Sequence, residues 1–474
     1  MCLNMNNLTV DQYIKGVKEW NFTSKEVVLT YQKQAKVLNP ELNACVRFDD
    51  EYVNAHLEEF SSKPLAALPI MIKDNILVEG ELVTCSSKML ENYRAPYTAT
   101  CMKKLEEAWA LMIGQTNMDE FAMWWSTETS YYWKTINPNG KNRIPWGSSW
   151  GSAVAVASDM AIAALWTDTW WSVRQPAAMC WVVWMKPTYW AISRYWVIAM
   201  ASSLDQVWVF WKKVDDVRLL LSYIVWYDEQ DSTSSKEADA LQEKLKKDSE
   251  EKKYKVLVPE EVIDEWLDER IKDLFLKKIE DLKAKWYQVD IKPLPILKDA
   301  LAIYYTIMPA EVSTNLSRFD GLRFWHQENT QNYDSLDDYY ASIRADGFWE
   351  EAKRRILLWT FVLSSANYEW YYLKALQAQK KLQSDLWKVY EEYDIILMPT
   401  SPEPAWKIGD RVSDPLKMYL ADLYTVPANL AWLPAVSVPL WKINDNWESL
   451  PVGIQAMWKK FSDDCILDFA KKLE

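Results

Sequence analysis

Histidine and glycine are the residue types in which this sequence is poorest. Only two histidines, His56 and His326, occur among 474 residues, and both lie in polar stretches. Two scattered histidines make a Ser-His-Asp triad and a multi-histidine metal site poor fits to this chain. The 10 glycines also fall far below the roughly 33 that an average usage of about 7% gives for this length.

The chain also lacks a surplus of basic residues and a pattern of paired cysteines. Its net charge is −13 and its pI is about 5.0, whereas a domain that grips nucleic acid through its own surface is usually basic. The six cysteines are scattered without a CxxC pair, which is typical of reduced thiols in a cytosolic protein. We therefore expect no dominant nucleic-acid binding by this chain itself.

No segment has the pattern of an export signal or a membrane span. The first residues, MCLNMNNLTVDQYIKG, lack a basic stretch followed by a long apolar run. The most apolar helical candidate, 152–165, is too short to cross a bilayer and carries Asp159. The sequence predicts a soluble, cytoplasmic protein.

Tryptophan is abundant where glycine is scarce. The chain has 29 tryptophans, and many lie in short turns such as WGSSWGS and TDTWWS. Tryptophan strongly resists positive φ, so it is a poor residue for such turns. We hypothesise that most of these tryptophans are glycines in the protein itself, for instance through UGA codons translated under the wrong genetic code. The alternative is a chain that is genuinely rich in tryptophan.

Alternating strand and helix patterns predict the fold class. Helical periodicity covers most of 8–60 and 260–390, and 152–165 is expected to be a helix. The apolar runs at 68–78 and 395–402 have the pattern of buried strands. We expect an α/β fold, a single large domain whose mixed central β-sheet is covered by helices on both faces.

Shifts in composition suggest a division of the chain into four parts. A strongly charged stretch, 228–253, is expected to be a solvated connection that contains a helix. The four parts are an N-terminal helical segment at 1–60, a core with the candidate motifs at 61–227, the charged connection and a mostly helical segment at 228–390, and the C-terminal part of the core at 391–474.

Lys73 is a candidate catalytic base because it lies in the apolar run LPIMIKDNILV. A serine hydrolase without a usable histidine needs another base, and burial can lower the pKa of a lysine toward neutrality. The alternative is a lysine at a strand end whose stem packs while its amine reaches water. From these residues alone, that second interpretation is favoured.

A serine-rich loop, GSSWGS at 147–152, precedes the expected helix. Backbone N–H groups and hydroxyls of such a loop point into a cleft. The pattern fits an N-cap or a phosphate loop equally well, although it lacks the lysine of a Walker motif.

A second polar loop, TDTWWSVRQPA at 167–177, contains the candidate nucleophile Ser172. If its two tryptophans are glycines, successive N–H groups form a concave nest suited to an oxyanion. The alternative is a polar loop capped by Asp168.

The three motifs IKDN, GSSWGSA and TDTWWSVRQPA resemble, in order and spacing, those of the amidase signature family. Lys73 and Ser148 are 75 residues apart, and Ser148 and Ser172 are 24 apart. With W read as G, the two loops become PGGSSGGSA and GTDTGGSVRQPA. The resemblance implies an amidase-signature domain with a Ser–cis-Ser–Lys triad formed by Ser172, Ser148 and Lys73, and it outweighs the alternative interpretations above.

The same resemblance implies a covalent mechanism. Ser148 relays a proton between Ser172 and a neutral Lys73, and the relay also protonates the leaving ammonia. The implied oxyanion hole consists of the backbone N–H groups of Thr169, Trp170, Trp171 and Ser172. The residues implied to support the site are Ser149, Asp168 and Arg174.

Later segments resemble one branch of this family, the A subunits of tRNA-dependent amidotransferases. The markers include TNMDEFAM, NLSRFDGLRF and MYLADLYTVPANLAWLPAVSVPL. The resemblance implies hydrolysis of glutamine to glutamate and ammonia, for transamidation of Glu-tRNA(Gln), Asp-tRNA(Asn) or both. It also implies a heterotrimer with amidotransferase subunits B and C. No cofactor is expected in this chain, because ATP, Mg²⁺ and the misacylated tRNA are implied to be handled mainly by the first of these partners.

For glutamine itself, the resemblance implies three contacting residues. Arg355, in KRRI, pairs with the carboxylate, Asp422, in MYLADL, pairs with the ammonium, and Met123 lines the pocket. Arg354 is the alternative to Arg355. Without the resemblance, these charges are interpreted as solvated positions on a helix surface.

The printed tryptophans depart from the family pattern. They would crowd the oxyanion hole, the cis-Ser loop and the substrate pocket at Trp170 and Trp171, at Trp146 and Trp150, and at Trp124 and Trp125, respectively. If they are real, we expect a dead or misfolded enzyme. Two other functions therefore stay open, a stand-alone amidase acting on small amides and a catalytically silent scaffold.

Overall fold

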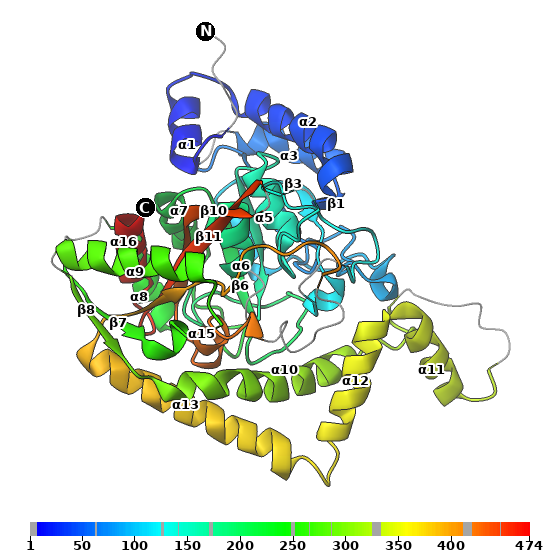
Figure 1. Ribbon diagram of the computed structural model, residues 1–474. Helices are drawn as coiled ribbons and strands as arrows, with labels where there is room; N and C mark the ends of the chain where they lie inside the picture. Colours follow the sequence, from blue (N-terminus) through cyan, green and yellow to red (C-terminus); the bar gives the residue numbers. More distant parts are fainter. Residues whose placement is uncertain are drawn as a thin grey trace.

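The computed structural model describes residues 7–61, 64–124, 128–140, 142–169, 174–247, 252–264, 266–285, 287–324, 333–410, 420–445 and 447–474 (Figure 1). Within these ranges, every helix is too short or too polar to span a bilayer.

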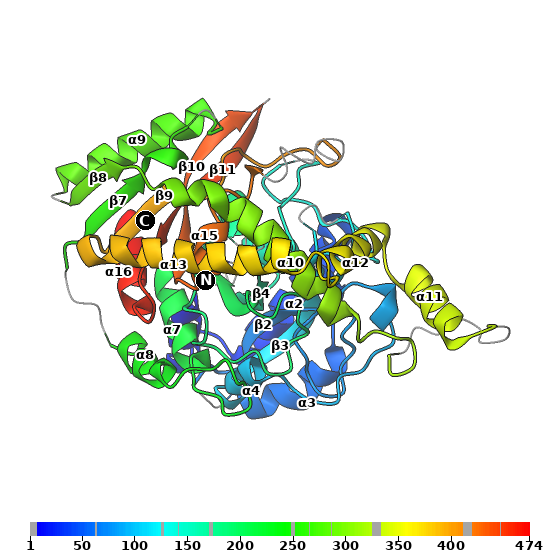
Figure 2. The ribbon, with the colours of Figure 1, turned by 90° about the horizontal axis from the view of Figure 1, so that it is seen from below.

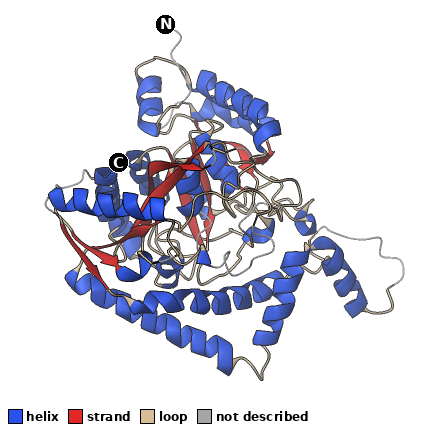
Figure 3. Cartoon of the chain, viewed as in Figure 1, coloured by secondary structure: helices blue, strands red, loops and turns tan. Residues whose placement is uncertain are grey.

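The described strands belong to one central sheet (Figure 3). In chain order they are β1 (Cys45–Arg47), β2 (Leu68–Lys73), β3 (Ala110–Thr116), β4 (Ala163–Asp168), β5 (Val183–Lys186), β6 (Gln206–Trp211), β7 (Lys255–Pro259), β8 (Gln288–Lys292), β9 (Ile395–Pro399), β10 (Ala435–Asp445) and β11 (Glu448–Met457). Their spatial order is β1-β3-β2-β4-β6-β5-β10-β11-β9-β7-β8. β2 pairs in parallel with β3 and β4, and β7 pairs in parallel with β8 and β9, whereas the other pairs are antiparallel.

Helices cover this mixed sheet on both faces, which confirms the predicted α/β class (Figures 1 and 2). The helices before β7 are α1 (Val10–Lys18), α2 (Ser24–Leu42), α3 (Asp50–Phe60), α4 (Thr100–Glu107), α5 (Trp150–Ala157), α6 (Arg174–Cys180), α7 (Val214–Ile224) and α8 (Glu237–Leu245). Those after it are α9 (Glu269–Ala284), α10 (Ala300–Leu316), α11 (Leu336–Gly347), α12 (Glu350–Val362), α13 (Lys374–Glu392), α15 (Val426–Leu430) and α16 (Asp463–Leu473).

The middle of the sheet is built from strands that are buried along their whole length. Every residue of β2, β3 and β4 is buried, as parallel strands covered on both faces require. β2 lies between the other two, and its last residue, Lys73, is in register with Thr116 at the end of β3. The lysine side chain therefore starts inside the protein.

The predicted helix at 152–165 is wrong in its second half. α5 ends at Ala157, Asp159 has a left-handed backbone with φ 57°, and β4 begins at Ala163. The apolar run that follows this turn is a buried strand, and periodicity cannot distinguish a buried strand from a buried helix over so few residues. Similarly, the strand predicted at 68–78 ends at Lys73.

The proposed division into four parts stays a prediction. Each of 1–60, 61–227, 228–390 and 391–474 contributes at least one strand to the same sheet. The N-terminal part is mostly helical but also contains β1.

One side of the molecule is formed by long helices. α10 packs against both α12 and α13, and Figure 1 shows these helices along the lower edge, with α12 and α11 extending to one side. α10 is apolar around its whole circumference, which fits its position between the core and the other two helices.

Candidate active site

The Lys73 amine lies in a buried pocket of hydroxyl and carbonyl groups. Its Nζ donates to Ser148 Oγ at 3.0 Å, to Ser149 Oγ at 2.6 Å and to the carbonyl oxygen of Thr167 at 3.2 Å. The side chain has no exposed surface. The structure thus brings together two of the three residues of the predicted triad.

Burial changes the acid–base chemistry of this amine. It lowers the pKa of Lys73 to about 7, against the opposing attraction of the carboxylates of Asp168, Asp119 and Asp205. Because the charged form of a lysine is the one that loses hydration, desolvation favours the neutral amine. A substantial fraction of Lys73 can therefore accept a proton near neutral pH.

The loop that carries Ser148 is tightly held. The Gly147–Ser148 peptide bond is cis, and α5 starts two residues later. Ser149 Oγ also donates to the carbonyl oxygen of Thr167, at 3.0 Å. A Cβ added to Gly151 would lie 2.4 Å from the carbonyl oxygen of Asn117, so the first turn of α5 sits directly on the neighbouring backbone.

Three predicted site residues, Trp170, Trp171 and Ser172, lie outside the described residues. The residue before them, Thr169, donates from Oγ1 to Asp205 Oδ1 at 2.7 Å. Asp205 in turn accepts from the backbone N–H groups of residues 200 and 201. The N-terminal flank of the predicted oxyanion segment is thereby fixed.

The C-terminal flank of that segment is fixed by Arg174, the first residue of α6. Its guanidinium lies 3.8 Å from Asp168 Oδ2 and donates to Asn429 Oδ1 and, at 3.2 Å, to Gln455 Oε1. Asn429 Nδ2 donates to Asp168 Oδ2 at 3.2 Å. Burial raises the pKa of Asp168 and lowers the pKa of Arg174 to about 10, while the attraction between the two groups opposes both shifts.

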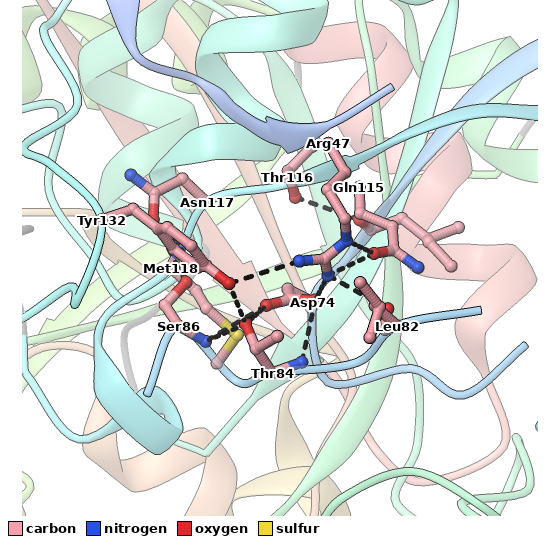
Figure 4. Close-up of polar contacts among 11 residues, drawn as sticks. Arg47, Asp74, Leu82, Thr84, Ser86, Gln115, Thr116, Asn117, Met118 and Tyr132 are labelled. Carbon is pink, nitrogen blue, oxygen red and sulfur yellow. Dashed lines mark hydrogen bonds and ion pairs between the residues drawn. The ribbon is translucent and has the colours of Figure 1, made fainter. Parts of the chain in front are cut away.

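Asp74, next to Lys73, anchors the end of β2 through a second buried network (Figure 4). Its carboxylate forms an ion pair with Arg47 and accepts from the Thr84 hydroxyl. It also accepts from the backbone N–H groups of Thr84 and Ser86, both at 3.2 Å. Because these donors come from separate segments, the network fixes the backbone from which Lys73 projects.

Asp119 connects the catalytic loop to the surface. Its backbone N–H donates to the Ser148 carbonyl oxygen at 3.3 Å, and its Oδ1 accepts from Thr129 Oγ1 at 2.7 Å. Burial raises the pKa of Asp119 to about 8. Thr129 lines a cleft of about 1060 Å³ between α10 and α12. A chain of contacts therefore runs from this cleft to Ser148.

Arg355 lies in this cleft, on α12. Its Nε donates to Glu351 Oε1 at 2.8 Å, and its guanidinium carbon lies 5.1 Å from the ring centroid of Trp124. The neighbouring Arg354 also lines the cleft, but its side chain is 69% exposed whereas that of Arg355 is 8% exposed. Arg355 is thus the more firmly held of the two predicted anion-binding residues. Met123, beside Trp124, is buried.

Asp422 lies close to the same cleft. Its Oδ2 accepts from the hydroxyl of Tyr305, a cleft residue, at 2.6 Å. Burial raises the pKa of Asp422 well above its usual range, although the hydroxyl and the charge of Arg355 oppose this shift. The two residues predicted to bind the ends of an amino acid therefore interact electrostatically in one region.

Sequence reasoning missed Arg47 and the role of Asp119. Arg47 is in the three-residue strand β1, too short for a pattern, and its partner Asp74 is 27 residues away. Asp119 lies within the marker TNMDEFAM, and only the fold brings its amide to Ser148. Among the described residues, the His, Cys, Asp and Glu side chains form no group of three or more that could hold a metal ion.

A buried lysine of lowered pKa, hydrogen-bonded to a serine hydroxyl, defines a class of hydrolase that uses lysine in place of histidine as its base. The amidase family model matches residues 26–467. The chain belongs to the amidase family.

Named relatives extend this finding. The sequence is 41% identical over 483 residues to the A subunit of glutamyl-tRNA(Gln) amidotransferase from Caldanaerobacter subterraneus subsp. tengcongensis, covering 100% of this chain and 97% of the relative. It is 42% identical over 463 residues to the protein of the same name from Campylobacter hominis, covering 97% and 98%.

Solved structures share the same architecture. The crystal structure of the A subunit of glutamyl-tRNA(Gln) amidotransferase from Thermotoga maritima has a TM-score of 0.80 and 36% identity, covering 100% of this chain and 96% of that chain. The 6-aminohexanoate cyclic dimer hydrolase has a TM-score of 0.83, covering 98% and 96%, but only 21% identity. This second likeness shows the fold alone.

Proposed function

We propose that this chain is the glutamine-hydrolysing A subunit of a tRNA-dependent amidotransferase, and that it converts glutamine to glutamate and ammonia. The observation that carries the proposal is the buried contact between Lys73 Nζ and Ser148 Oγ. It occurs in a chain that matches amidotransferase A subunits over nearly its full length.

The first half of the reaction forms an acyl-enzyme. The Ser172 oxygen attacks the carboxamide carbon of glutamine, and its proton passes to Ser148 while the Ser148 proton passes to the neutral Lys73 amine. The carbonyl electron pair moves onto oxygen, where backbone N–H groups of 169–172 stabilise the oxyanion. When the carbonyl re-forms, the C–N bond breaks and the leaving nitrogen takes a proton back from Lys73 through Ser148, so that ammonia leaves.

The second half hydrolyses the ester on Ser172. Water attacks the acyl carbon and gives its proton to the same relay, and collapse of the intermediate returns a proton to the Ser172 oxygen. Glutamate is released and Lys73 is neutral again. Each proton that Lys73 accepts is returned within the same half-reaction, so the enzyme is unchanged after each turnover.

The cleft supplies groups of the charge that an amino acid needs. Arg355 offers a planar guanidinium for the α-carboxylate of glutamine, and Asp422 a carboxylate for its α-ammonium. Because burial raises the pKa of Asp422, an approaching ammonium would favour its ionised form and gain a buried ion pair. Met123, at the inner end of the segment that borders the cleft, contributes apolar surface for the substrate chain.

The ammonia is used by a complex. We propose that subunits B and C join this chain in a heterotrimer that works in the cytoplasm, and that the first of these partners holds the misacylated tRNA, ATP and Mg²⁺. The acidic net charge of −13 fits a chain that leaves the grip on tRNA to its partners. The acceptor is Glu-tRNA(Gln), Asp-tRNA(Asn) or both.

The test combines this chain with candidate B and C subunits and measures glutamine-dependent amidation of charged tRNA. Ser172→Ala should preserve the complex and abolish glutaminase activity, whereas unchanged activity would contradict the assignment. A free chain that hydrolyses small amides, with no response to tRNA or ATP, would instead identify a stand-alone amidase. A complex whose amidation ignores Ser172→Ala would identify a silent scaffold.

A further inference from the structure

Several tryptophans lie in backbone that tryptophan does not ordinarily adopt. Eight of those described have φ between 59° and 83°. In this left-handed region a Cβ crowds the following carbonyl oxygen, and glycine is the residue that occupies it routinely. These tryptophans are Trp20, Trp109, Trp146, Trp181, Trp190, Trp196, Trp432 and Trp447.

Some of these positions are helix ends at which glycine is the common residue. Trp20 follows α1, and its N–H donates to the Val17 carbonyl oxygen at 3.2 Å. The next N–H, of Asn21, donates to the Gly16 carbonyl oxygen at 2.9 Å. This pair of bonds is a Schellman motif, whose left-handed position is usually glycine. The same pair closes α15 around Trp432.

Trp447 occupies a turn in which glycine is equally favoured. Asp445 and Glu448 are the last paired residues of the β10–β11 hairpin, so residues 446 and 447 form a two-residue connection. Trp447 has φ 71° and is fully exposed. The sequence here is Asn-Trp, whereas Asn-Gly is among the preferred dipeptides for such a connection.

A second set of tryptophans is buried without a partner for the indole N–H. Buried donors are almost always hydrogen-bonded in native proteins. The ring centroids of Trp166 and Phe210 also lie 3.4 Å apart, well inside the roughly 4.5–7 Å that aromatic pairs prefer. Among the described residues, the buried indoles without a hydrogen-bond partner are Trp146, Trp150, Trp166, Trp184, Trp208 and Trp211.

These observations are independent of the composition, which points the same way: 10 glycines and 29 tryptophans. We propose that the tryptophans of both sets are glycines in the protein that the source organism makes. A codon that the organism reads as glycine, for instance UGA, and that is translated here as tryptophan produces this pattern. One substitution explains the left-handed backbone, the unbonded indoles and the missing glycines together.

The assignment has a consequence for the active site, which rests on the proposed function. Trp146 and Trp150 flank the Ser148 loop, and glycine at both positions removes two buried indoles from beside the proposed proton relay. Trp170 and Trp171, outside the described residues, border Ser172 in the sequence in the same way. The native enzyme then has a site of small residues with accessible backbone N–H groups.

The direct test is mass spectrometry of the protein isolated from the source organism. The intact mass should fall below that of the printed sequence by the same tryptophan-to-glycine difference at each reassigned position. Peptides covering residues 20, 432 and 447 should contain glycine. Peptides that contain tryptophan at these positions would overturn the proposal, whatever the activity of the enzyme.

Stability measurements supply a second test. In a chain with glycine at all positions of both sets, retaining tryptophan at position 20 or 447 should lower Tm, because the left-handed backbone is strained by a Cβ. The matched control is Trp387→Gly, at an exposed position inside α13, which should also lower Tm because glycine weakens a helix interior. A higher Tm with tryptophan at 20 and 447 would contradict the proposal.

Discussion

Lys73 and Lys186 occupy equivalent positions on two strands of the same sheet, yet only one faces hydroxyl groups. Each ends a buried strand, is itself buried, and has its pKa lowered by burial to about 7. Lys73 donates to two serine hydroxyls and a carbonyl oxygen. Lys186 donates to the carbonyl oxygen of Pro187 at 3.1 Å and lies 5.1 Å from the ring centroid of Trp208.

The difference shows what burial alone does not provide. A neutral amine becomes a useful base only when a group that can release a proton lies within hydrogen-bond reach. A serine hydroxyl can both give and take a proton, whereas a backbone carbonyl can only accept a hydrogen bond. We therefore assign the chemistry to Lys73 and a structural role to Lys186.

The largest expected effect is from Lys73→Met. Removing the base should lower kcat by roughly 10³- to 10⁴-fold, since general acid–base catalysis contributes on this scale. The matched control is Lys186→Met, which removes a lysine of the same burial and the same lowered pKa. Glutaminase assays of the two variants should differ by orders of magnitude, and equal losses would show that the two lysines are not distinguished by their hydroxyl partners.

Ser148→Ala should have the next largest effect. It removes the hydroxyl between Lys73 and the nucleophile, so kcat should fall by about 10²- to 10³-fold with little change in KM. Steady-state kinetics with glutamine test this. A variant with near-normal kcat would show that the proton does not pass through Ser148.

The positions of these residues were only partly predictable from the sequence. The apolar run around Lys73 and the serine loop before α5 carry local signals, and both were predicted. Lys186 also follows an apolar run, in WMKP, and nothing local separates it from Lys73. What separates them is the sheet order, which sets β2 beside β4 and near the Ser148 loop. Such contacts join residues 75 apart and need the fold.

The same limit explains the other differences. The apolar residues at 163–165 continue a helical composition, and only the left-handed turn at Asp159 and the pairing with β2 make them a strand. Arg47 and Asp74 carry no sign of their pairing, because each is one charged residue in a short segment.

The anchor beside Lys73 gives a stability prediction. Arg47→Met leaves the carboxylate of Asp74 buried without its cation, and loss of one partner of a buried ion pair costs about 3–5 kcal/mol. Chemical denaturation should report this loss, with reduced activity because β2 is less firmly held. Lys25→Met, which breaks the exposed pair with Glu58, should cause no measurable loss. Equal effects would contradict the anchoring role of the Asp74 network.

The smallest expected effect is on stability in Lys186→Met. The folded-state pKa of about 7 lies below the ordinary value of 10.5, so between these values the unfolded chain holds more protons than the folded one. The free energy of unfolding of the native protein should therefore fall as pH drops through this window, by up to about 1.4 kcal/mol per pH unit from this group. The variant should lose that part of the pH dependence. An unchanged slope would show that Lys186 is charged in the folded state.

The neutrality of Lys73 just above pH 7 underlies the whole proton relay. It is tested most directly by NMR titration of the ε-methylene carbons of isotope-labelled lysines, with Lys73→Met and Lys186→Met used to assign the two unusual signals. We expect two lysines that titrate near pH 7, one of which disappears in each variant. A Lys73 signal that titrates near the ordinary value of 10.5 would contradict the relay.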